Sequence, residues 1–180
     1  MESETAADND ATIARLGLRP TDAVLEIGFG PGRALDRVAA IVTAGHVAGV
    51  DASADMVATA TRRCRHPVER GRMDLRLGVV EDLPFADDAF DAAYSVHTLY
   101  FWERPARAVD ELRRVLKHAG RLVLCFRRRD DDATADFPSS VYRFNTGDEV
   151  AELLRAGGFE QIAVDEPAAR GLLIATARRR

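Results

Sequence analysis

The chain has 180 residues, of which 47% are apolar and 30% charged, and its formal net charge is -4 at pH 7. This size and composition predict a single globular domain with a full hydrophobic core, and the acidic balance argues against a nucleic-acid partner. No apolar run approaches the length of a membrane span, and residues 1–10 lack the apolar segment of a signal peptide, so we expect no membrane span.

The two cysteines, Cys64 and Cys125, fall in a helical pattern and in a strand pattern. The sequence has no CxxC motif and no Cys/His pair at ligand spacing. We therefore predict neither a disulfide framework nor a metal site, and we expect a reducing, cytoplasmic location.

The first half of the chain alternates strand and helix patterns. Short apolar runs typical of buried strands occupy residues 24–27, 46–50, 75–80 and 90–96. Apolar residues at three- and four-residue steps predict helices over residues 10–18, 33–42 and 54–64, with Gly45 ending the second and Ser53 or Asp55 capping the third. Residues 1–9 are expected to fray, and residues 66–72 to form a polar connector. This alternation predicts a parallel sheet with helices on both faces.

The second half of the chain predicts two more helices and three more strands. A helix begins at Pro105 and ends at Gly120, and a fifth strand follows at residues 121–126. A long loop is expected at residues 127–145, and Thr146 with Glu149 has the pattern of a capping box that opens a helix. The last strands, at residues 159–164 and 172–177, predict an antiparallel hairpin with a turn around Pro167 and Gly171.

The stretch from Val24 to Arg33 carries the strongest local motif. A strand pattern is followed by Gly28, Gly30 and Gly32, and a helical pattern begins at Arg33. Glycines permit a sharp turn and let a ligand approach the main chain, and the helix N-terminus behind them offers free N–H groups. The spacing Gly-x-Gly-x-Gly differs from the dinucleotide fingerprint Gly-x-Gly-x-x-Gly, because Arg33 stands at its third glycine. A tight turn without a ligand is the alternative.

Polar side chains follow the other predicted strands. In an open doubly wound sheet the ligand lies at the carboxyl ends of the strands, near the first one. Asp51 follows the second strand about twenty residues after the glycines, where a carboxylate can accept two hydrogen bonds from a ribose diol. Capping the helix from Ala54 is its alternative role. Residues 79–82 and 95–97 reach the same edge from the third and fourth strands.

Further motifs follow the glycine turn in a fixed order. The matching segments are Val24–Gly32, Gly49–Asp51, Glu81–Phe85 with Phe90–Asp91, Tyr100–Trp102, Glu111–Lys117 and Gly157–Phe159. With these motifs, over residues 11–177, the chain resembles the class I S-adenosylmethionine-dependent methyltransferases of the small-molecule type, such as those of ubiquinone and menaquinone biosynthesis. The resemblance implies a three-layer, doubly wound α/β fold with a mostly parallel seven-stranded sheet and an antiparallel C-terminal strand. The resemblance also implies a cofactor-binding methyltransferase domain at residues 19–180, and the residues before it predict a short leader with a helix at residues 1–18.

The same resemblance implies which residues hold S-adenosylmethionine. Grouped by the part of the cofactor they face, they are Glu26, Gly28, Phe29, Gly30 and Gly32 for the methionine part, Asp51 and Ala52 for the ribose, Val80 and Glu81 for the adenine, and Ser95 for the floor beneath the sulfonium. A carboxylate-rich rim with backbone donors suits a cation that carries an amino acid head group.

Two features depart from the family pattern. Relatives commonly have Gly-Asp-Ala where this chain has Gly78-Val79-Val80, so the acidic side chain that takes the adenine amino group is absent, and backbone groups or Glu81 are the substitutes. Similar proteins usually carry a longer helical leader, whereas residues 1–18 precede the first strand here. An open site, a truncated start, or a site completed by a homodimer or another partner would each account for the short leader.

Methyl transfer from a sulfonium depends mainly on positioning, because the leaving group is already activated. His97, just past the fourth strand, is the residue near the expected methyl group that can take a proton near neutral pH, and an orienting or packing role is its alternative. Tyr100, Phe101 and Trp102 are expected to wall an apolar substrate pocket or cover the cofactor, with core packing as the alternative.

Three functions remain open from the sequence. We favour transfer of a methyl group from S-adenosylmethionine to a small-molecule acceptor. A degenerate cofactor-binding or partner-dependent protein is the second, supported by Val79 and the short leader. A nicotinamide-linked oxidoreductase is the third, and Arg33 and the segment Leu83–Phe85 argue against it. No Asn-Pro-Pro-Tyr or Asp-Pro-Pro-Tyr segment follows the fourth strand, which argues against a nucleic-acid base as the acceptor.

Overall fold

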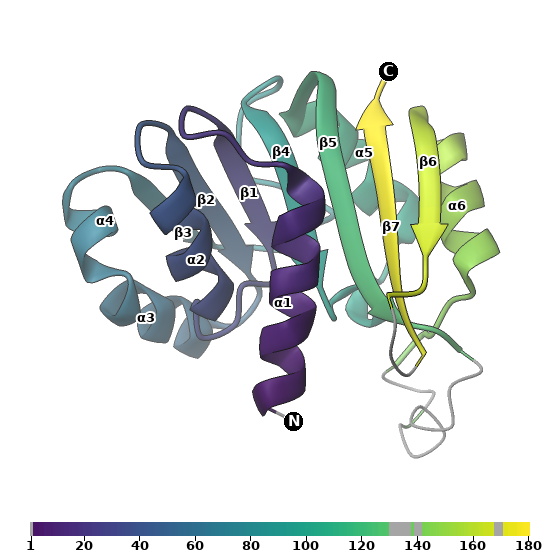
Figure 1. Cartoon of the computed structure of the whole chain (residues 1–180), viewed down its shortest axis with the longest axis horizontal. Helices are drawn as coiled ribbons and strands as arrows, with labels where there is room; N and C mark the ends of the chain where they lie inside the picture. Colours follow the sequence, from purple (N-terminus) through teal and green to yellow (C-terminus); the bar gives the residue numbers. More distant parts are fainter. Residues whose placement is uncertain (1, 130–137, 139–141, 168–170) are drawn as a thin grey trace.

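The chain forms one mixed sheet with helices on both faces (Figure 1). The computed structural model describes residues 2–129, 138, 142–167 and 171–180, with side chains from Ala6 onward. Its strands are β1 (Ala23–Ile27), β2 (His46–Asp51), β3 (Met73–Leu77), β4 (Phe90–Val96), β5 (Leu116–Arg127), β6 (Phe159–Asp165) and β7 (Leu172–Arg179). Its helices are α1 (Glu2–Leu16), α2 (Arg33–Ile41), α3 (Ala54–Arg63), α4 (Arg65–Glu69), α5 (Pro105–Val115) and α6 (Gly147–Ala156), with a 3-10 turn, η1 (Leu99–Phe101).

The strand order in the described part of the chain is β3-β2-β1-β4-β5-β7-β6. Strands β1 to β5 pair in parallel, and β7 lies between β5 and β6 and is antiparallel to both. The predicted seven-stranded, mostly parallel sheet with an antiparallel C-terminal strand is therefore confirmed. The chain runs from β1 outward to β3 and returns to β4 on the other side of β1, so the switch point of the sheet lies between β1 and β4.

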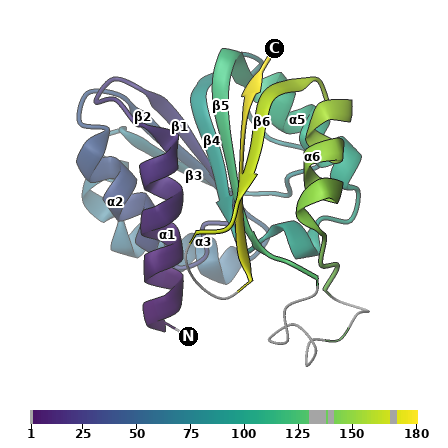
Figure 2. The ribbon, with the colours of Figure 1, turned by 45° about the vertical axis from the view of Figure 1, so that its right-hand side comes forward.

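The sheet is the middle of three layers. Helices α1, α2 and α3 lie on one face, and α5 and α6 lie on the other (Figure 2). Alternation along β1 sends Val24 into the core beneath α1 and α2, and sends Leu25 and Ile27 into the core beneath α5 and α6. Each helix completes a core with an apolar stripe, and Leu35 of α2 and Leu112 of α5 are fully buried.

Three helix starts follow the predicted capping chemistry. The Ser53 hydroxyl accepts a hydrogen bond from the Met56 N–H at 3.4 Å, which caps α3. Thr146 and Glu149 form a reciprocal capping box at the start of α6. Pro105 stands in the first turn of α5, where its missing N–H needs no partner.

The first helix is longer than the sequence predicts. The expected fraying of residues 1–9 is wrong for residues 2–9, because they belong to α1. Arg37 of α2 donates to the Ala6 carbonyl at 3.3 Å and pairs with Asp10, and the Asn9 side chain is buried. Hydrogen bonds and ion pairs hold this part of α1 in place. Its residues are mostly polar and form no apolar stripe, so the helical pattern could not be recognised in the sequence.

The helix predicted to run to Gly120 ends at Val115, and β5 begins at once at Leu116. Leu116 pairs with Phe90 of β4, and the register then shifts before the regular pairing resumes. A Cβ atom on Gly120 would lie 2.7 Å from the Lys117 carbonyl oxygen, so this glycine serves a tight bend within the strand. The prediction that it ends the helix is wrong.

Gly45 also has a different role from the predicted one. Helix α2 ends at Ile41, and a Cβ atom on Gly45 would lie 2.1 Å from the carbonyl oxygen of Asp22. The glycine therefore allows the start of β2 to approach the start of β1, where the His46 N–H donates to the same carbonyl at 3.1 Å.

Four further predictions differ in their bounds or lie partly outside the described residues. The connector predicted at residues 66–72 contains the short helix α4, and the third strand is Met73–Leu77 rather than residues 75–80. Residues 130–137 and 139–141 of the predicted loop, and residues 168–170 of the predicted hairpin turn, lie outside the described residues. Among the described helices, none combines the length and apolar character needed to cross a bilayer.

Candidate functional site

A cavity of about 380 Å³ opens at the carboxyl ends of β1, β2 and β4, at the switch point of the sheet. This volume is within the range of roughly 300 to 1,000 Å³ that is typical of small-molecule sites. Six of the predicted site residues line it, namely Gly28, Asp51, Ala52, Val80, Glu81 and His97. Apolar side chains complete the wall, from Val79, Val96, Phe101 and Trp102. The other five predicted residues, Glu26, Phe29, Gly30, Gly32 and Ser95, lie around the cavity rather than in this lining.

The three glycines of the turn after β1 serve three different purposes. Gly28 has a φ of 69°, and a Cβ atom there would lie 2.3 Å from the Thr98 methyl group, so the turn after β4 can approach only a glycine. Gly30 has a φ of 51° and faces open space, with no atom within 4 Å of an added Cβ. Gly32 has a φ of 80° and begins α2, where an added Cβ would lie 2.9 Å from the Ala60 side chain of α3.

Phe29 and Ser95 support this turn from beneath. The Phe29 ring is buried, and a Cβ atom on Gly49 of β2 would lie 2.5 Å from it. Ser95 is 1% exposed, and its hydroxyl is hydrogen-bonded to the Thr98 hydroxyl. Both side chains therefore hold the wall of the cavity, and the hydroxyl pair places polar oxygen atoms below the end of β4.

Asp51 joins the turn after β1 to the turn after β2. Its Oδ2 accepts a hydrogen bond from the Gly30 N–H at 2.8 Å, and its Oδ1 accepts one from the Ser53 N–H at 2.9 Å. The cap of α3 is Ser53, so the carboxylate is not used as the helix cap. A carboxylate has about four acceptor sites, and two protein bonds leave acceptor capacity on each oxygen for a ligand in the cavity.

Glu26 lies behind the turn, on the opposite face of β1 from the cavity-lining Ile27. Its side chain is buried, and its Oε2 accepts a hydrogen bond from the Tyr94 hydroxyl at 2.6 Å. Burial raises the pKa of Glu26 to about 8, against the opposing effect of the Tyr94 bond, and the nearby Asp51 charge raises it further. At pH 7 this carboxyl group is therefore mostly protonated, and its hydrogen bond with Tyr94 joins β1 to β4 behind the turn.

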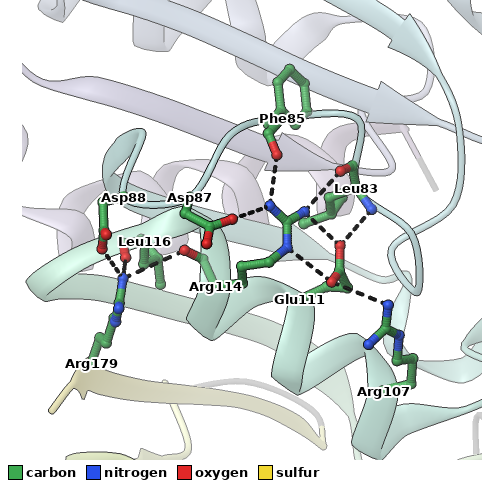
Figure 3. Close-up of polar contacts among 9 residues, drawn as sticks. All are labelled: Leu83, Phe85, Asp87, Asp88, Arg107, Glu111, Arg114, Leu116 and Arg179. Atoms are coloured by element: carbon green, nitrogen blue, oxygen red, sulfur yellow. Dashed lines mark hydrogen bonds and ion pairs between the residues drawn. The ribbon is translucent and has the colours of Figure 1, made fainter.

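The segment after β3 is held onto α5 by a network of charged side chains (Figure 3). Arg114 donates to the carbonyl oxygens of Leu83 and Phe85, at 2.9 and 2.8 Å. The Glu111 carboxylate accepts the Leu83 N–H at 2.9 Å and pairs with Arg114 at 2.7 Å. The Arg114 hydrogen bonds lower the pKa of Glu111, against the opposing effect of its burial. Because Val80 and Glu81 lie in this segment, Glu111 and Arg114 fix one wall of the cavity.

The same network extends in both directions along α5. Arg107 donates to the Glu81 carbonyl at 3.2 Å, beside the cavity. At the other end, Arg179 of β7 contacts Asp88 and the Leu116 carbonyl (Figure 3). Sequence reasoning found Glu111–Lys117 as a motif without a role. One signal in the sequence could have revealed the network. Glu111 interrupts the apolar face of this helix, and Arg114 follows it three positions later.

His97 has a partner at each ring nitrogen. Its Nδ1 lies 2.8 Å from the Tyr100 hydroxyl, and its Nε2 lies 2.7 Å from the Asp8 carboxylate of α1. The Tyr100 hydroxyl in turn accepts the Arg127 N–H at 2.7 Å. The imidazole is thus held in one orientation at the cavity wall. To act as a base toward a ligand, it would have to exchange the Tyr100 hydroxyl for that ligand.

The aromatic residues after β4 divide between the core and the cavity. Tyr100 and Trp102 are buried, whereas Phe101 is 51% exposed and lines the cavity with Trp102. Two aromatic side chains that the sequence did not suggest join them, because Phe101 packs against Tyr142 and Tyr100 against Phe144, with ring centroids 5.0 and 4.8 Å apart. The Arg143 N–H donates to the Tyr100 carbonyl at 3.1 Å, which fixes residues 142–144 beside η1.

Comparison with protein families gives one match, to the methyltransferase domain, over residues 25–124. The uncharacterized methyltransferase YdaC of Bacillus subtilis is 29% identical, with 91% of this chain and 86% of YdaC covered. The O-methyltransferase resE of Aspergillus sclerotiorum is 30% identical, with 81% of this chain and 58% of resE covered. This chain therefore spans most of the bacterial relative and little more than half of the fungal one.

Solved structures of the same fold include a SAM-dependent methyltransferase from Aquifex aeolicus. It superposes with a TM-score of 0.77 over 95% of this chain and 89% of its own length, at 22% sequence identity. The arrangement of the sheet and its switch point is thus common to both proteins.

The buried Glu26 predicts a pH dependence of stability. The folded state keeps the Glu26 proton up to about pH 8, whereas the unfolded chain releases it near the ordinary glutamate pKa of 4.5. The folded state therefore binds more protons between these values, and stability falls as pH rises through this window, by up to about 1.4 kcal/mol per pH unit. Glu26→Gln keeps an acceptor for Tyr94 and removes the ionisation. Denaturant unfolding at pH 5 to 8 should show a shallower decline for Glu26→Gln, and identical slopes would contradict the burial effect.

The Glu111–Arg114 pair predicts a large and partly reversible loss of stability. Arg114→Met removes the cation at 2.7 Å from the buried Glu111 carboxylate and the donor to two carbonyl groups, which should cost about 3 kcal/mol of unfolding free energy. Adding Glu111→Gln removes the buried charge that has lost this cation and keeps the acceptor for Leu83, so the double variant should be more stable than Arg114→Met alone. Arg113→Met, on the same helix, is the control and should change stability by less than about 0.5 kcal/mol. Additive losses in the double variant would disprove the coupling.

Proposed function

We propose that this chain, which belongs to the methyltransferase domain family, transfers a methyl group from S-adenosylmethionine to a small-molecule acceptor that binds at the mouth of the cavity. The family match and the methyltransferase relatives make it an S-adenosylmethionine-dependent methyltransferase. The observation that carries the proposed site is the position of Asp51, which lines the cavity at the end of β2 with unused acceptor capacity.

The described residues fit the cofactor. Gly30 turns a face without side-chain atoms toward open space, next to a carboxylate that can bind the ribose diol. Glu81 is 6% exposed and lines the cavity, and its Oε1 accepts the Arg104 N–H at 3.2 Å, which leaves its other oxygen for the adenine amino group. Val79 gives the cavity an apolar wall beside Glu81, at the end where the adenine is proposed to bind, in place of a second carboxylate. When bound, S-adenosylmethionine supplies a methyl group on a sulfonium, which is an activated donor.

The chain's own residues would mainly position the reactants and exclude water. Gly28 and Asp51 hold the turns after β1 and β2, which would bind the methionine and ribose parts of the cofactor, and the segment held by Glu111 and Arg114 would border its adenine. The hydroxyl groups of Ser95 and Thr98 lie below the end of β4, where the resemblance puts the sulfonium. Glu26 would act from behind the turn, through the main chain, rather than by direct contact with the methionine part. Because positioning can supply most of the rate acceleration, no further catalytic acid is needed.

The acceptor is proposed to be a small molecule with an apolar, planar part. Phe101 is half exposed at the cavity mouth and packs against Tyr142, so an aromatic surface borders the place where an acceptor would approach. The fungal relative named as an O-methyltransferase supports a hydroxyl as one acceptor group. The net charge of -4 continues to argue against a nucleic-acid acceptor.

Location and assembly follow as lesser parts of the proposal. Cys64 and Cys125 are free, buried thiols, which supports a cytoplasmic location. A homodimer or another partner that completes the site is supported by exposed apolar side chains. Val79 and Phe101, which line the cavity, are 48% and 51% exposed, and Leu77 at the end of β3 is 58% exposed.

A cofactor-binding protein without activity is the second candidate function. The occupied ring nitrogens of His97 and the apolar Val79 favour it, because each removes a group that could act on a ligand. Incubating the chain with radiolabelled S-adenosylmethionine and a host extract separates the two functions. Labelled small-molecule products support the transferase, whereas tight binding without labelled product supports the second candidate.

The ribose site predicts the effect of removing Asp51. Asp51→Ala should weaken binding of S-adenosylhomocysteine by about 1 to 3 kcal/mol, because it deletes charge-assisted hydrogen bonds to the ribose. Isothermal calorimetry gives the affinity directly. Asp55→Ala is the matched control, because Asp55 is an exposed carboxylate four residues later, in the first turn of α3. Equal affinities for the two variants would refute the ribose assignment.

A further inference from the structure

The N-terminal half of α1 lies at the same edge of the sheet as the tips of β1 and β4 (Figure 1). There the Asp8 carboxylate lies 2.7 Å from Nε2 of His97, a residue that lines the cavity. The two side chains are only 14% and 22% exposed. We propose that Asp8 is a positioning residue of the site, which keeps the ring hydrogen of His97 on Nε2 and so makes Nδ1, the partner of the Tyr100 hydroxyl, the ring nitrogen that can accept a proton.

Hydrogen-bond chemistry assigns the proton along the whole chain of contacts. An ionised carboxylate only accepts, so Nε2 must carry the hydrogen that it donates to Asp8. The Tyr100 oxygen already accepts the Arg127 N–H, and its own hydrogen has Nδ1 as an acceptor at 2.8 Å. The direction of donation is thus Arg127 to Tyr100, Tyr100 to His97, and His97 to Asp8. With the opposite tautomer, Nε2 and the carboxylate would face each other without a proton.

The backbone at His97 shows that its surroundings hold the ring in place. His97 has a φ of 58°, a conformation that is strained for a residue with a side chain and persists only where neighbours enforce it. Its N–H donates to the Cys125 carbonyl at 2.9 Å, which ties the turn after β4 to β5. Without this conformation the imidazole would follow the β4 direction and could not bridge Tyr100 and α1.

Asp8 therefore extends the site beyond the part of the chain that the family match covers. The family match covers residues 25–124, whereas Asp8 precedes it and the Arg127 N–H follows it. The use of the lone pair in methyl transfer rests on the proposed function. An acceptor hydroxyl that replaces Tyr100 at Nδ1 would give its proton to Nδ1 and keep the electron pair on its oxygen. Asp8 would then stabilise the imidazolium through the second nitrogen.

Nitrogen-15 NMR of the histidine rings tests the assignment in the unliganded, full-length chain. Two-bond proton–nitrogen correlations distinguish a protonated from an unprotonated ring nitrogen, and His97→Gln identifies the His97 signals among those of the four histidines. At neutral pH we expect His97 to carry its hydrogen on Nε2. A hydrogen on Nδ1 would overturn the proposal.

Variants of α1 separate positioning from simple docking of the helix. Asp8→Ala should give tautomer-averaged His97 shifts, and Asp8→Glu should restore the Nε2–H pattern. Asp10→Ala removes another carboxylate of α1, which pairs with Arg37 of α2, and should leave the His97 signals unchanged. Lower thermal stability of Asp8→Ala with an unchanged tautomer would reduce Asp8 to a docking contact and overturn the proposal. The measurement uses neither cofactor nor acceptor, so it stands or fails separately from the proposed function.

Discussion

The geometry of the site depends on one carboxylate, because Asp51 fastens the turn after β1 to the turn after β2. Its two oxygens accept the N–H groups of Gly30 and Ser53, on either side of the cavity. The Gly28 N–H adds a backbone bond of 2.7 Å to the Val50 carbonyl, so the two strand ends are joined by side-chain and main-chain contacts together. Both turns are thereby held ready before a ligand arrives, which reduces the ordering cost of binding.

The two acidic residues of the motif region have opposite environments. Asp51 is partly exposed and satisfied by backbone donors, whereas Glu26 is buried beside Tyr94 and mostly protonated at pH 7. The Asp51 charge would repel an ionised Glu26, so a neutral Glu26 removes that cost from the folded state. The Asp51 carboxylate is thus available for a ligand in the cavity, whereas the Glu26 carboxyl group joins β1 to β4 within the core.

The sequence predicted the parts of the fold that depend on local patterns. The glycine turn, the caps at Ser53 and Thr146, and the antiparallel last strand follow from residues close together in the chain. The cavity-lining position of Asp51 followed from its spacing to the turn. The side of the sheet that Glu26 faces was open to the same reasoning, because alternation along β1 places it opposite Leu25 and Ile27.

Contacts between distant segments could not be predicted in this way. Asp8 and His97 are 89 positions apart, and Leu83 and Glu111 are 28 positions apart, so no local periodicity connects them. The start of α1 was missed for a related reason, since its stabilising contacts are polar and come from α2 and the turn after β4. Tyr142 and Phe144 acquire their role only where residues 142–144 fold back onto η1.

A crystal structure of the chain with S-adenosylhomocysteine tests the central role of Asp51 most directly. We predict that both ribose hydroxyl oxygens lie about 2.6 to 3.2 Å from the Asp51 carboxylate. The bonds from the Gly30 and Ser53 N–H groups should remain in place. A ribose bound elsewhere, or an Asp51 side chain that leaves Gly30 to reach it, would contradict the account.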